Sequence, residues 1–574
     1  MPLDYLWKPQ VLADEKELSA FKAELPISEI FLSLLLQRGI SNRSEAEAFF
    51  NPNLQKLHNP FLMKDMDKAV YRINQAIKSK EKIMVYGDYD VDGTTAVALF
   101  SGFLEKHYPE VSTYIPDRYK EGYGVSQAGI DFAAAQNISL IIALDCGIKA
   151  IDKVDYALAR GIDFIICDHH TPGDILPKAA AVLDPKRSDC VYPYKGLSGC
   201  GVGFKLVQAL CEDWDLSDEH WRPYLDLLAV SIGADIVPMS GENRILTYYG
   251  LQQINSEPSP GLESLIKIAK PTGGKLDISD VVFMLAPRIN AAGRLAHGKK
   301  AVELLRGQDL SIIDAIAQNI NKNNTERKSL DQSITEEALR QIQRQEEEHR
   351  KSSVVYEASW HKGVIGIVAS RLIENYYRPT IVFTKSGDKL AGSARTVAGF
   401  DVYQALLKCD HILEQFGGHP AAAGMTLKEE RYEEFKTHFE KVVSESILPE
   451  QLLPNISYDL QIKLEDLSQN FYNTIQRFAP FGPDNLSPIF RSDGLINQGS
   501  RAVGEGQKHL KLGILDPDTG IVMDGIGFGM AHYLQKLQSG KEVSILYHLE
   551  QNVFRNKVSL QLRLLDLKLS EELS

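Results

Sequence analysis

Short apolar segments alternate with helical segments between residues 66 and 185, and this alternation constrains the fold more than any other feature of the chain. The expected strands are residues 83–86, 111–115, 140–144, 164–167 and 180–183. The expected helices between them include residues 97–106, 127–134 and 150–159. Such alternation is typical of a parallel, doubly wound α/β sheet. In that fold, ligands bind beyond the carboxyl ends of the strands.

Three carboxylates follow the first expected strand. Asp88, Asp90 and Asp92 stand at alternate positions before Gly93, where a helix is expected to begin. Carboxylates this close repel one another unless a cation lies among them, so the loop predicts a divalent-cation site. An EF-hand calcium loop begins in the same way, but its twelfth position must be Glu, and here it is Leu99. An apolar strand also precedes the loop, so the EF-hand interpretation is disfavoured.

Other residues that bind metals follow later apolar segments. Asp145 ends one expected strand, and Asp168, His169 and His170 end another. Asp235 follows the apolar stretch 228–234, where we expect a further strand to end. Each has an ordinary alternative, because Asp often caps a helix and paired histidines often lie on the surface. Together they predict a metal site at one edge of the sheet. Carboxylates with one or two imidazoles suit Mn²⁺ or Mg²⁺.

The rest of the chain divides by pattern. Residues 1–65 carry no recognisable site, and we expect them to pack on the first domain. Residues 311–350 are charged and rich in helix formers, which predicts a long solvent-exposed helix, with a disordered linker as the alternative. Residues 351–450 predict a second α/β lobe. The C-terminal segment predicts an OB-like β-barrel built from residues 488–496, 509–515, 521–529, 542–550 and 558–567.

Composition sets broad limits. At 574 residues with 44% hydrophobic and 24% charged residues, the chain fits a globular protein of about three to four domains. We expect no membrane segment and no secretory signal, and six cysteines without a C-x-x-C pair fit a reduced, cytoplasmic protein. The net charge of −13 lowers the expectation of a nucleic-acid partner without deciding it.

Seven motifs together resemble a known family. GDYDVDG at residues 87–93, Asp145, the DHH triplet at residues 168–170 and Asp235 resemble, in order and spacing, the four motifs of the DHH phosphoesterase superfamily. APRINAAGRL, WHKGVIGIVASRL and FGGHPAAAGM at residues 286–295, 360–372 and 416–425 are similar to motifs of its single-strand-specific exonucleases, the RecJ family. The resemblance implies five parts: an N-terminal extension (1–65), a DHH catalytic domain (66–305), a connecting helix (306–350), a DHH-associated substrate-binding domain (351–450) and an OB-like nucleic-acid-binding domain (451–574).

The resemblance also implies roles at the metal site, which would hold two divalent cations, Mn²⁺ or Mg²⁺. Asp145 would bridge the ions, with Asp92, His169 and Asp235 on one and Asp90, supported by Asp88, on the other. The catalytic residues would be Asp145, Asp168 and His170, with His170 facing the scissile phosphate. Many relatives carry a histidine four residues before the first paired aspartate, where this chain has Tyr86.

Several residues outside the metal site are candidates for substrate binding. Arg288 and Arg294 flank Asn290, and they form either a salt bridge or, as we favour, a phosphate clamp. Gly417, Gly418 and His419 predict a glycine-rich turn in front of a helix, where backbone amides approach a ligand. Further candidates for contact with the strand are Arg395 in the second lobe and His509, Lys511, Phe554 and Arg555 in the barrel.

The activity that the resemblance implies is metal-dependent 5′-to-3′ exonuclease digestion of single-stranded DNA to mononucleotides, in DNA repair and recombination. A DHH phosphodiesterase acting on nanoRNA or cyclic dinucleotides and a non-catalytic DNA-binding scaffold are the alternatives. The expected partners are single-stranded DNA, a helicase and a single-strand-binding protein, and the expected state is a cytoplasmic monomer that does not bind membranes.

Overall fold

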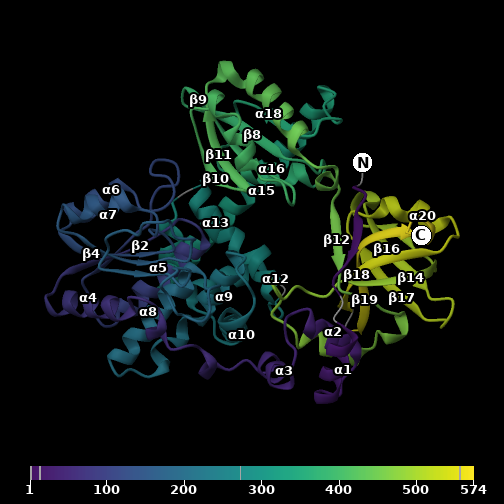
Figure 1. Ribbon diagram of the computed structural model, residues 1–574, viewed down its shortest axis with the longest axis horizontal. Helices are drawn as coiled ribbons and strands as arrows, with labels where there is room; N and C mark the ends of the chain where they lie inside the picture. The colour runs from purple at the N-terminus through teal and green to yellow at the C-terminus, as the bar shows by residue number, and fades with distance from the viewer. Residues whose placement is uncertain (1–2, 12–13, 272, 296, 555–556, 574) are drawn as a thin grey trace. The chain divides into compact units, whose positions relative to one another are not determined.

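A computed structural model describes residues 3–11, 14–271, 273–295, 297–554 and 557–573. The chain divides into two compact units (Figure 1). The central unit comprises Pro52–Leu452, and the terminal unit joins Met1–Asn51 to Leu453–Ser574.

A five-stranded parallel sheet in the order β3-β2-β4-β5-β6 forms the first layer of the central unit. Its strands are β2 (Lys82–Gly87), β3 (Val111–Tyr114), β4 (Ile138–Leu144), β5 (Asp163–Cys167) and β6 (Ala181–Leu183). Alternate residues face opposite sides: Ile83 and Val85 join one hydrophobic cluster, whereas Met84 and Tyr86 join another. The expectation of a doubly wound parallel sheet is confirmed.

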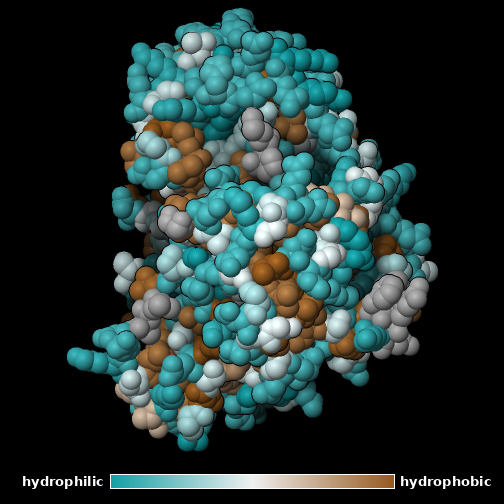
Figure 2. Space-filling view, turned by 90° about the vertical axis from the view of Figure 1, so that its right-hand side faces the viewer, coloured by the Kyte–Doolittle hydropathy of each residue, from teal (hydrophilic) through white to brown (hydrophobic). Residues whose placement is uncertain are grey.

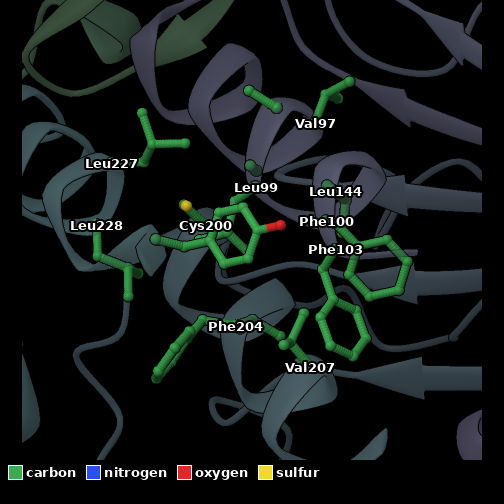
Figure 3. Close-up of a cluster of buried hydrophobic side chains, with 14 of the residues drawn as sticks. Val97, Leu99, Phe100, Phe103, Leu144, Cys200, Phe204, Val207, Leu227 and Leu228 are labelled. Atoms are coloured by element: carbon green, nitrogen blue, oxygen red, sulfur yellow. The ribbon is translucent and has the colours of Figure 1, made fainter. Parts of the chain in front are cut away.

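Helices cover both faces of this sheet (Figure 1). One face carries α4 (Met66–Lys78), α5 (Val91–Glu105) and α8 (Gly199–Asp213), and the other carries α6 (Gln127–Ala135) and α7 (Ile151–Leu158). Figure 3 shows the packing on the first face, where Phe100 and Phe103 of α5 lie near Phe204 of α8. Burial on both faces explains the nearly continuous apolar sequences of the central strands.

The apolar stretch before Asp235 is a helix rather than a strand. Helix α9 (Leu225–Ala234) is buried from Leu225 to Gly233, and Leu227 and Leu228 pack into the core of Figure 3. A helix that is buried on all sides lacks the polar stripe that would reveal its period. Asp235 therefore reaches the metal site from the end of a helix, and the expectation that all four motifs lie at strand ends is corrected.

The remaining helices of this part lead to the second lobe. They are α10 (Gly241–Ser256), α11 (Pro260–Ala269), α12 (Ile278–Asp280), the π-helical turn η5 (Val281–Leu285), α13 (Ala286–Leu295), α14 (Lys299–Arg306) and α15 (Leu310–Arg344). The 35-residue α15 is a single helix, but it is not solvent-exposed all round. Ile313, Ala317 and Ile320 are buried on it, and so are Ile334 and Ala338 further along, so the expectation of a fully exposed helix is wrong for one face.

The second lobe contains a mixed sheet in the order β10-β11-β9-β8-β7. Its elements are β7 (Ser353–Tyr356), α16 (Ile365–Ile373), β8 (Thr380–Ser386), β9 (Lys389–Arg395), α17 (Val402–Leu407), β10 (Gln415–His419), β11 (Ala422–Leu427) and α18 (Tyr432–Ser446). The expected helix behind the glycine-rich turn does not form. His419 pairs with Ala422 at the end of a β-hairpin, and the small residues that follow form strand β11.

In the terminal unit, the strand pairings close a ring. β14 pairs with β18 and β16, β18 with β19, β19 with β17, and β17 with β16. The strands are β1 (Leu6–Pro9), β12 (Asn455–Tyr458), β13 (Leu460–Gln461), β14 (Phe490–Asn497), β15 (Arg501–Val503), β16 (His509–Leu515), β17 (Val522–Gly527), β18 (Val543–Phe554) and β19 (Lys557–Leu569). Helices α19 (Gln469–Gln476) and α20 (Leu534–Gln538) accompany them. Five strands in a closed ring match the expected OB-like barrel.

The N-terminal residues pack on this barrel unit. Strand β1 pairs in parallel with β12, and helices α1 (Glu15–Glu24), α2 (Glu29–Leu36) and α3 (Arg43–Phe50) complete the packing. Phe21, Phe31 and Leu32 share a hydrophobic cluster with barrel residues such as Phe490 and Tyr547. The expectation that residues 1–65 pack on the first domain is therefore wrong for Met1–Asn51.

On the face that Figure 2 shows, hydrophilic residues cover most of the surface and hydrophobic residues gather in separate patches. Within the described part of the chain, no helix has both the length and the apolar character needed to cross a membrane.

Candidate metal centre

The acidic loop connects strand β2 to helix α5. Asp90 caps the helix, since its Oδ1 accepts a hydrogen bond from the Gly93 amide at 3.0 Å, and Asp92 lies in the first turn. A Cβ at Gly93 would lie 2.4 Å from the Asp88 carbonyl oxygen, so the loop can close only around a glycine. Asp88 is buried and accepts from the Gly124 amide at 3.3 Å through Oδ1.

Asp92 is held by the N-terminus of helix α8. The Gly199 and Cys200 amides donate to its two carboxylate oxygens at 2.6 and 2.9 Å, and the Ser231 hydroxyl donates at 2.6 Å. A Cβ on Gly199 would lie 2.4 Å from Cβ of Asp145, so only glycine lets α8 approach both carboxylates. Cys200 thus contributes its backbone amide, while its buried side chain packs in the core.

Asp145 follows strand β4 in a left-handed backbone conformation with φ of 60°. Such a conformation is costly for a residue other than glycine and is typical of active sites. Its buried Oδ1 has no hydrogen-bond partner in the described structure, and it lies 3.2 Å from Nε2 of His169. The unpartnered oxygen therefore faces the imidazole.

His169 presents one nitrogen to three carboxylates. Its Nε2 lies 3.8 Å from Asp92 Oδ2, 3.2 Å from Asp145 Oδ1 and 3.5 Å from Asp235 Oδ2. Its Nδ1 lies 3.1 Å from the Leu197 carbonyl oxygen, which can only accept. Nδ1 therefore carries the proton, which leaves the lone pair of Nε2 free among the carboxylates, as a metal-binding histidine requires.

Asp168 and His170 form a separate pair. His170 donates from Nδ1 to Asp168 Oδ1 at 2.7 Å, and the Ile148 amide donates to Asp168 Oδ2 at 2.9 Å. Burial opposes ionisation of Asp168, but the hydrogen bond and charge of His170 outweigh it and lower the pKa of Asp168 to about 2. Burial likewise opposes protonation of His170, but Asp168 outweighs it and raises the pKa of His170. His170 Nε2 points to the Tyr123 hydroxyl at 3.1 Å.

The electrostatics of the cluster favour a bound cation. Burial, followed by the charge of Asp90, raises the pKa of Asp88 to about 8, and burial with the charges of Asp92 and Asp90 raises the pKa of Asp235 to about 9. Burial and Asp92 likewise raise the pKa of Asp145 well above its ordinary value. A divalent cation would remove this repulsion.

The donor set also fits such a cation. Ligand atoms of Asp145, His169 and His170 lie within 4.8 Å of one another, and so do those of Asp92, His169 and Asp235. Three buried atoms without a hydrogen-bond partner lie close together: His169 Nε2 is 3.2 Å from Asp145 Oδ1 and 3.5 Å from Asp235 Oδ2. Asp88 Oδ2 is also buried without a partner. Carboxylate oxygens with an imidazole suit Mn²⁺ or Mg²⁺.

Tyr86, which replaces a histidine of many relatives, turns away from the carboxylates. Its ring belongs to the hydrophobic cluster on the face of the sheet that α6 and α7 cover, and it stacks on Tyr114 with ring centroids 5.3 Å apart. Its hydroxyl donates to the Gly124 carbonyl at 2.9 Å and accepts from the Ser126 amide at 3.1 Å. Tyr86 thus supports the loop that contacts Asp88.

The sequence interpretation did not include Arg118 and Tyr123. Both lie in the segment after strand β3, at the carboxyl edge of the same sheet, which was the available signal. The Arg118 guanidinium lies 4.8 Å from the centroid of the Tyr89 ring, and Tyr123 reaches His170. Ser231 of α9 and the Leu197 carbonyl, which hold metal-site side chains, were also missed.

The expected substrate-binding arginines are held by neutral groups, so the salt-bridge alternative fails among the described contacts. Arg288 donates to Asn321 Oδ1 and the Met284 carbonyl. Arg294 donates to the Gly363 carbonyl at 3.0 Å, and Arg395 donates to Ser393 Oγ and the Ala394 carbonyl. Burial and the charge of Arg118 lower the pKa of Arg294 to about 10 and also lower the pKa of Arg395. Asn290 is half-buried on α13.

The glycine-rich motif lies on an open surface of the second lobe. Gly417 pairs with Gly424 across the β10–β11 hairpin, and a Cβ on either would meet nothing within 4 Å. Neither glycine has a left-handed backbone, whereas Gly418 has φ of 151° and would clash with Ala422. His419 is exposed. Ser393 pairs with Gly424 and Arg395 with Ala422, so these residues share one face of the sheet.

Two barrel candidates lie on strand β16 of the terminal unit. His509 Nδ1 accepts from the Gly529 amide at 3.0 Å beside the exposed Phe528 ring, and Lys511 lies 3.5 Å from Asp524. Arg555 and the side chain of Phe554 lie outside the described residues.

Three family models match consecutive parts of the chain. They are the DHH family N-terminal domain at residues 82–232, the DHHA1 domain at residues 351–445 and the RecJ OB domain at residues 458–566. Solved structures agree with them. The crystal structure of RecJ from Thermus thermophilus in complex with Mn²⁺ matches with a TM-score of 0.82 at 26% identity, covering 98% of this chain and 79% of that one. The corresponding Mg²⁺ complex matches with a TM-score of 0.76 at 25% identity, covering 98% and 78%.

Relatives that match nearly the whole of this chain are also RecJ proteins. The single-stranded-DNA-specific exonuclease RecJ of Bacillus subtilis is 35% identical over 560 residues, covering 97% of this chain and 70% of the relative. RecJ of Escherichia coli is 33% identical over 569 residues, covering 95% and 96%. The chain therefore belongs to the RecJ family of single-stranded-DNA-specific exonucleases, built on the DHH fold.

Proposed function

We propose that this chain is a metal-dependent exonuclease that digests single-stranded DNA from the 5′ end to mononucleotides, in DNA repair and recombination. The observation that carries the proposal is the set of unpartnered carboxylate and imidazole atoms converging on one space in a chain of the RecJ family. A buried cluster of carboxylates that repel one another, and that keep oxygens without an internal hydrogen-bond partner, suits a centre that binds cations and promotes attack on a phosphodiester.

Asp145 would be shared by the two ions, because it lies within electrostatic reach of Asp90 and Asp92 and its Oδ1 faces His169 Nε2 at 3.2 Å. Asp92, His169 and Asp235 would complete one ion site, and Asp90 with Asp88 the other. When bound, Mn²⁺ or Mg²⁺ would supply an activated water and stabilise the leaving oxygen. The protein's own task is to hold the ligands rigidly, which the amides of α8 and the Leu197 carbonyl do.

His170 would act on the scissile phosphate, and Asp168 would position it. The Asp168 carboxylate accepts four hydrogen bonds, from His170 Nδ1 and three backbone amides, so it is fully occupied in orienting the histidine. Its charge favours the protonated imidazole, which can donate a hydrogen bond from Nε2 to a phosphate oxygen.

The strand would be held by arginines and by a bare sheet surface. Arg118, Arg294 and Arg395 lie within electrostatic reach of one another, and the neutral groups that hold Arg294 and Arg395 leave their charge available for phosphates. Gly417 and Gly424 beside Arg395 leave room for a nucleotide to lie directly on the backbone. Their glycine identity has no other cause within the described structure, which supports this role.

The proposal also covers the barrel contacts, the protein partners and the working form of the enzyme. We place binding of the unpaired strand at His509 and Lys511 of the barrel, where the Phe528 ring is open for base stacking. A helicase would supply the unpaired strand and a single-strand-binding protein would cover it. The working form would be a monomer in the cytoplasm.

A comparison of tailed duplexes tests the function. Purified protein should degrade a duplex with a 5′ single-stranded tail in Mn²⁺ or Mg²⁺, spare one with a 3′ tail, and stop with chelator. Asp145→Ala should lose at least about 10²-fold in rate, whereas Asp174→Ala, an exposed aspartate on the surface, should not. Equal rates on both tails, or a fully active Asp145→Ala, would refute the proposal. Faster hydrolysis of dinucleotides than of long strands would favour the nanoRNA alternative.

A further inference from the structure

Four cations from three helices form a surface region that the assignments above leave largely unused. This basic patch consists of Arg288 on α13, Arg327 and Lys328 on α15, and Arg371 on α16. Lys328 is exposed, Arg371 is about half exposed and Arg327 is buried. The positive charge of the patch contrasts with the formal net charge of the chain, which is −13.

Neutral side chains hold two of these guanidinium groups in place. Arg288 Nε donates to Asn321 Oδ1 at 3.0 Å, and Arg327 donates from Nε and Nη2 to Asn324 Oδ1 at 3.2 and 3.0 Å. Both asparagines belong to α15. An amide oxygen orients a guanidinium without neutralising it, whereas a structural ion pair would use a carboxylate.

Counter-charge at the basic patch is scarce. Among the ion pairs of the described residues, only Arg371 of these four has a partner, Asp331, at 2.9 Å. Partial burial and the charges of Arg288, Arg327 and Arg371 lower the pKa of Lys328. The charges that lower the pKa of Lys328 are all those of cations, whereas the Asp331 carboxylate acts on Arg327 and Arg371, so an anion beside Lys328 would relieve repulsion.

We propose that the basic patch binds a phosphate group of a nucleotide, as an extension of the strand path beyond the metal centre. The inference rests on the proposed function, because nucleotide phosphates are the anions that such an enzyme handles. Continuity supports it: Arg327 acts electrostatically on Arg294, which in turn lies near Arg118 and Arg395. The phosphate belongs either to the DNA strand or to a released mononucleotide, and the chemistry of the patch is the same for both.

Binding without hydrolysis tests the proposal. Fluorescence anisotropy with a labelled oligothymidylate in chelator should show weaker affinity for Lys328→Glu than for wild type, on the order of threefold to tenfold. The slope of log affinity against log salt should fall by about one. Lys322→Glu is the matched control, because Lys322 is equally exposed on α15 but lies about 120° round the helix. The control should bind as wild type does.

A second variant adds charge without removing a cation. Asn321→Asp keeps the size of the side chain and would neutralise Arg288, so it should weaken phosphate binding in the same direction. Competition with thymidine 5′-monophosphate separates the two sources. If the variants bind the oligonucleotide more weakly but thymidine 5′-monophosphate still displaces it as in wild type, the patch binds the DNA strand. If the variants keep their oligonucleotide affinity but the mononucleotide no longer displaces it, the patch binds the released mononucleotide.

If both variants match Lys322→Glu in strand affinity, salt slope and mononucleotide inhibition, the basic patch is not a phosphate site. Failure of the proposed function has a different signature, because wild-type protein itself would then show no metal-dependent hydrolysis of the tailed duplexes.

Discussion

At the scale of single residues, the Asp168 carboxylate orients the His170 imidazole and raises its pKa. We predict that Asp168→Asn lowers the pKa of His170 towards or below its ordinary value, because it removes both the negative charge and a strong acceptor. Histidine titration by NMR should report this shift. Exonuclease activity should fall by about 10- to 100-fold, as for loss of a group that orients a metal-site histidine.

The control for Asp168→Asn is Asp174→Asn, which changes an exposed aspartate in the loop that follows. It should leave both the titration and the activity as in wild type. An unchanged pKa of His170 in Asp168→Asn would contradict the orientation described here.

Ile236 is the second residue with an unusual conformation beside the metal centre. It follows Asp235 with φ of 58°, and the residue is 68% exposed. A β-branched residue is strained in this left-handed region, and little packing compensates it. We predict that Ile236→Gly raises the free energy of unfolding by about 0.5–1 kcal/mol.

Thermal unfolding in chelator would measure the effect of Ile236→Gly. The matched variant is Ile236→Ala, which keeps the Cβ and therefore the strain. Equal unfolding temperatures for the glycine and alanine variants would show that the backbone at this position is unstrained.

The sequence predicted the metal-site residues that lie close to one another along the chain. Asp88, Asp90 and Asp92 share one loop, and Asp168, His169 and His170 are adjacent, so the cluster was visible before folding. The roles of Ser231 and Leu197 could not be predicted, because they depend on contacts between segments far apart in the chain. A backbone carbonyl such as that of Leu197 leaves no trace in residue type.

At the scale of elements, two glycines of the second-lobe sheet differ in what surrounds them. Gly424 of the β10–β11 hairpin faces open space, whereas Gly392 of the neighbouring strand β9 packs against a buried ring. Gly424→Ala should leave stability nearly unchanged, since its Cβ would enter open space in an ordinary conformation. We predict a higher KM for single-stranded DNA, because the added methyl group would occupy the surface proposed for the nucleotide.

Gly392→Ala is the contrasting variant on the neighbouring strand β9. Its Cβ would lie 2.4 Å from the buried Phe383 ring, so we expect clear destabilisation in thermal unfolding. A Gly424→Ala protein that unfolds early, or that binds DNA as wild type does, would contradict the assignment of this surface.

The same hairpin shows why element type was harder to predict than the sheet itself. Strands β2, β4 and β5 are apolar on both faces and bounded by turns, which fixes their type. The Ala-Ala-Ala-Gly run after His419 favours helix by local propensity, yet pairing with Arg395, Ala394 and Ser393 makes it a strand. The opposite error occurred at α9, where a helix was expected to be a strand. Its complete burial removes the polar stripe that would have revealed the helical period.

At the scale of the whole molecule, the carboxylate cluster should make stability depend on pH and metal together. The pKa values of Asp88 and Asp235, about 8 and 9, are raised above those of an unfolded chain, near 4. Their contribution to stability is fully present below pH about 4 and is lost as pH rises through 8 and 9. Metal-free protein should therefore unfold at progressively lower temperature across this window.

Added Mn²⁺ should reverse that trend. Cation binding requires ionised carboxylates, so the rise in unfolding temperature on adding Mn²⁺ should be larger at pH 8.5 than at pH 6. Differential scanning calorimetry with Mn²⁺ or chelator would measure it. Asp235→Asn should reduce both the pH dependence and the metal effect; a metal effect that shrinks as pH rises would count against the site.

The shared unit of Met1–Asn51 and Leu453–Ser574 has a consequence for how the protein is made. Phe21, Phe31 and Leu32 leave the ribosome long before their packing partners, such as Phe490 and Tyr547, because more than 400 residues separate them in the sequence. At about 5–20 residues per second, the interval lasts on the order of half a minute. During this interval the central unit can fold, while helices α1 and α2 keep their apolar faces exposed until the barrel strands are made.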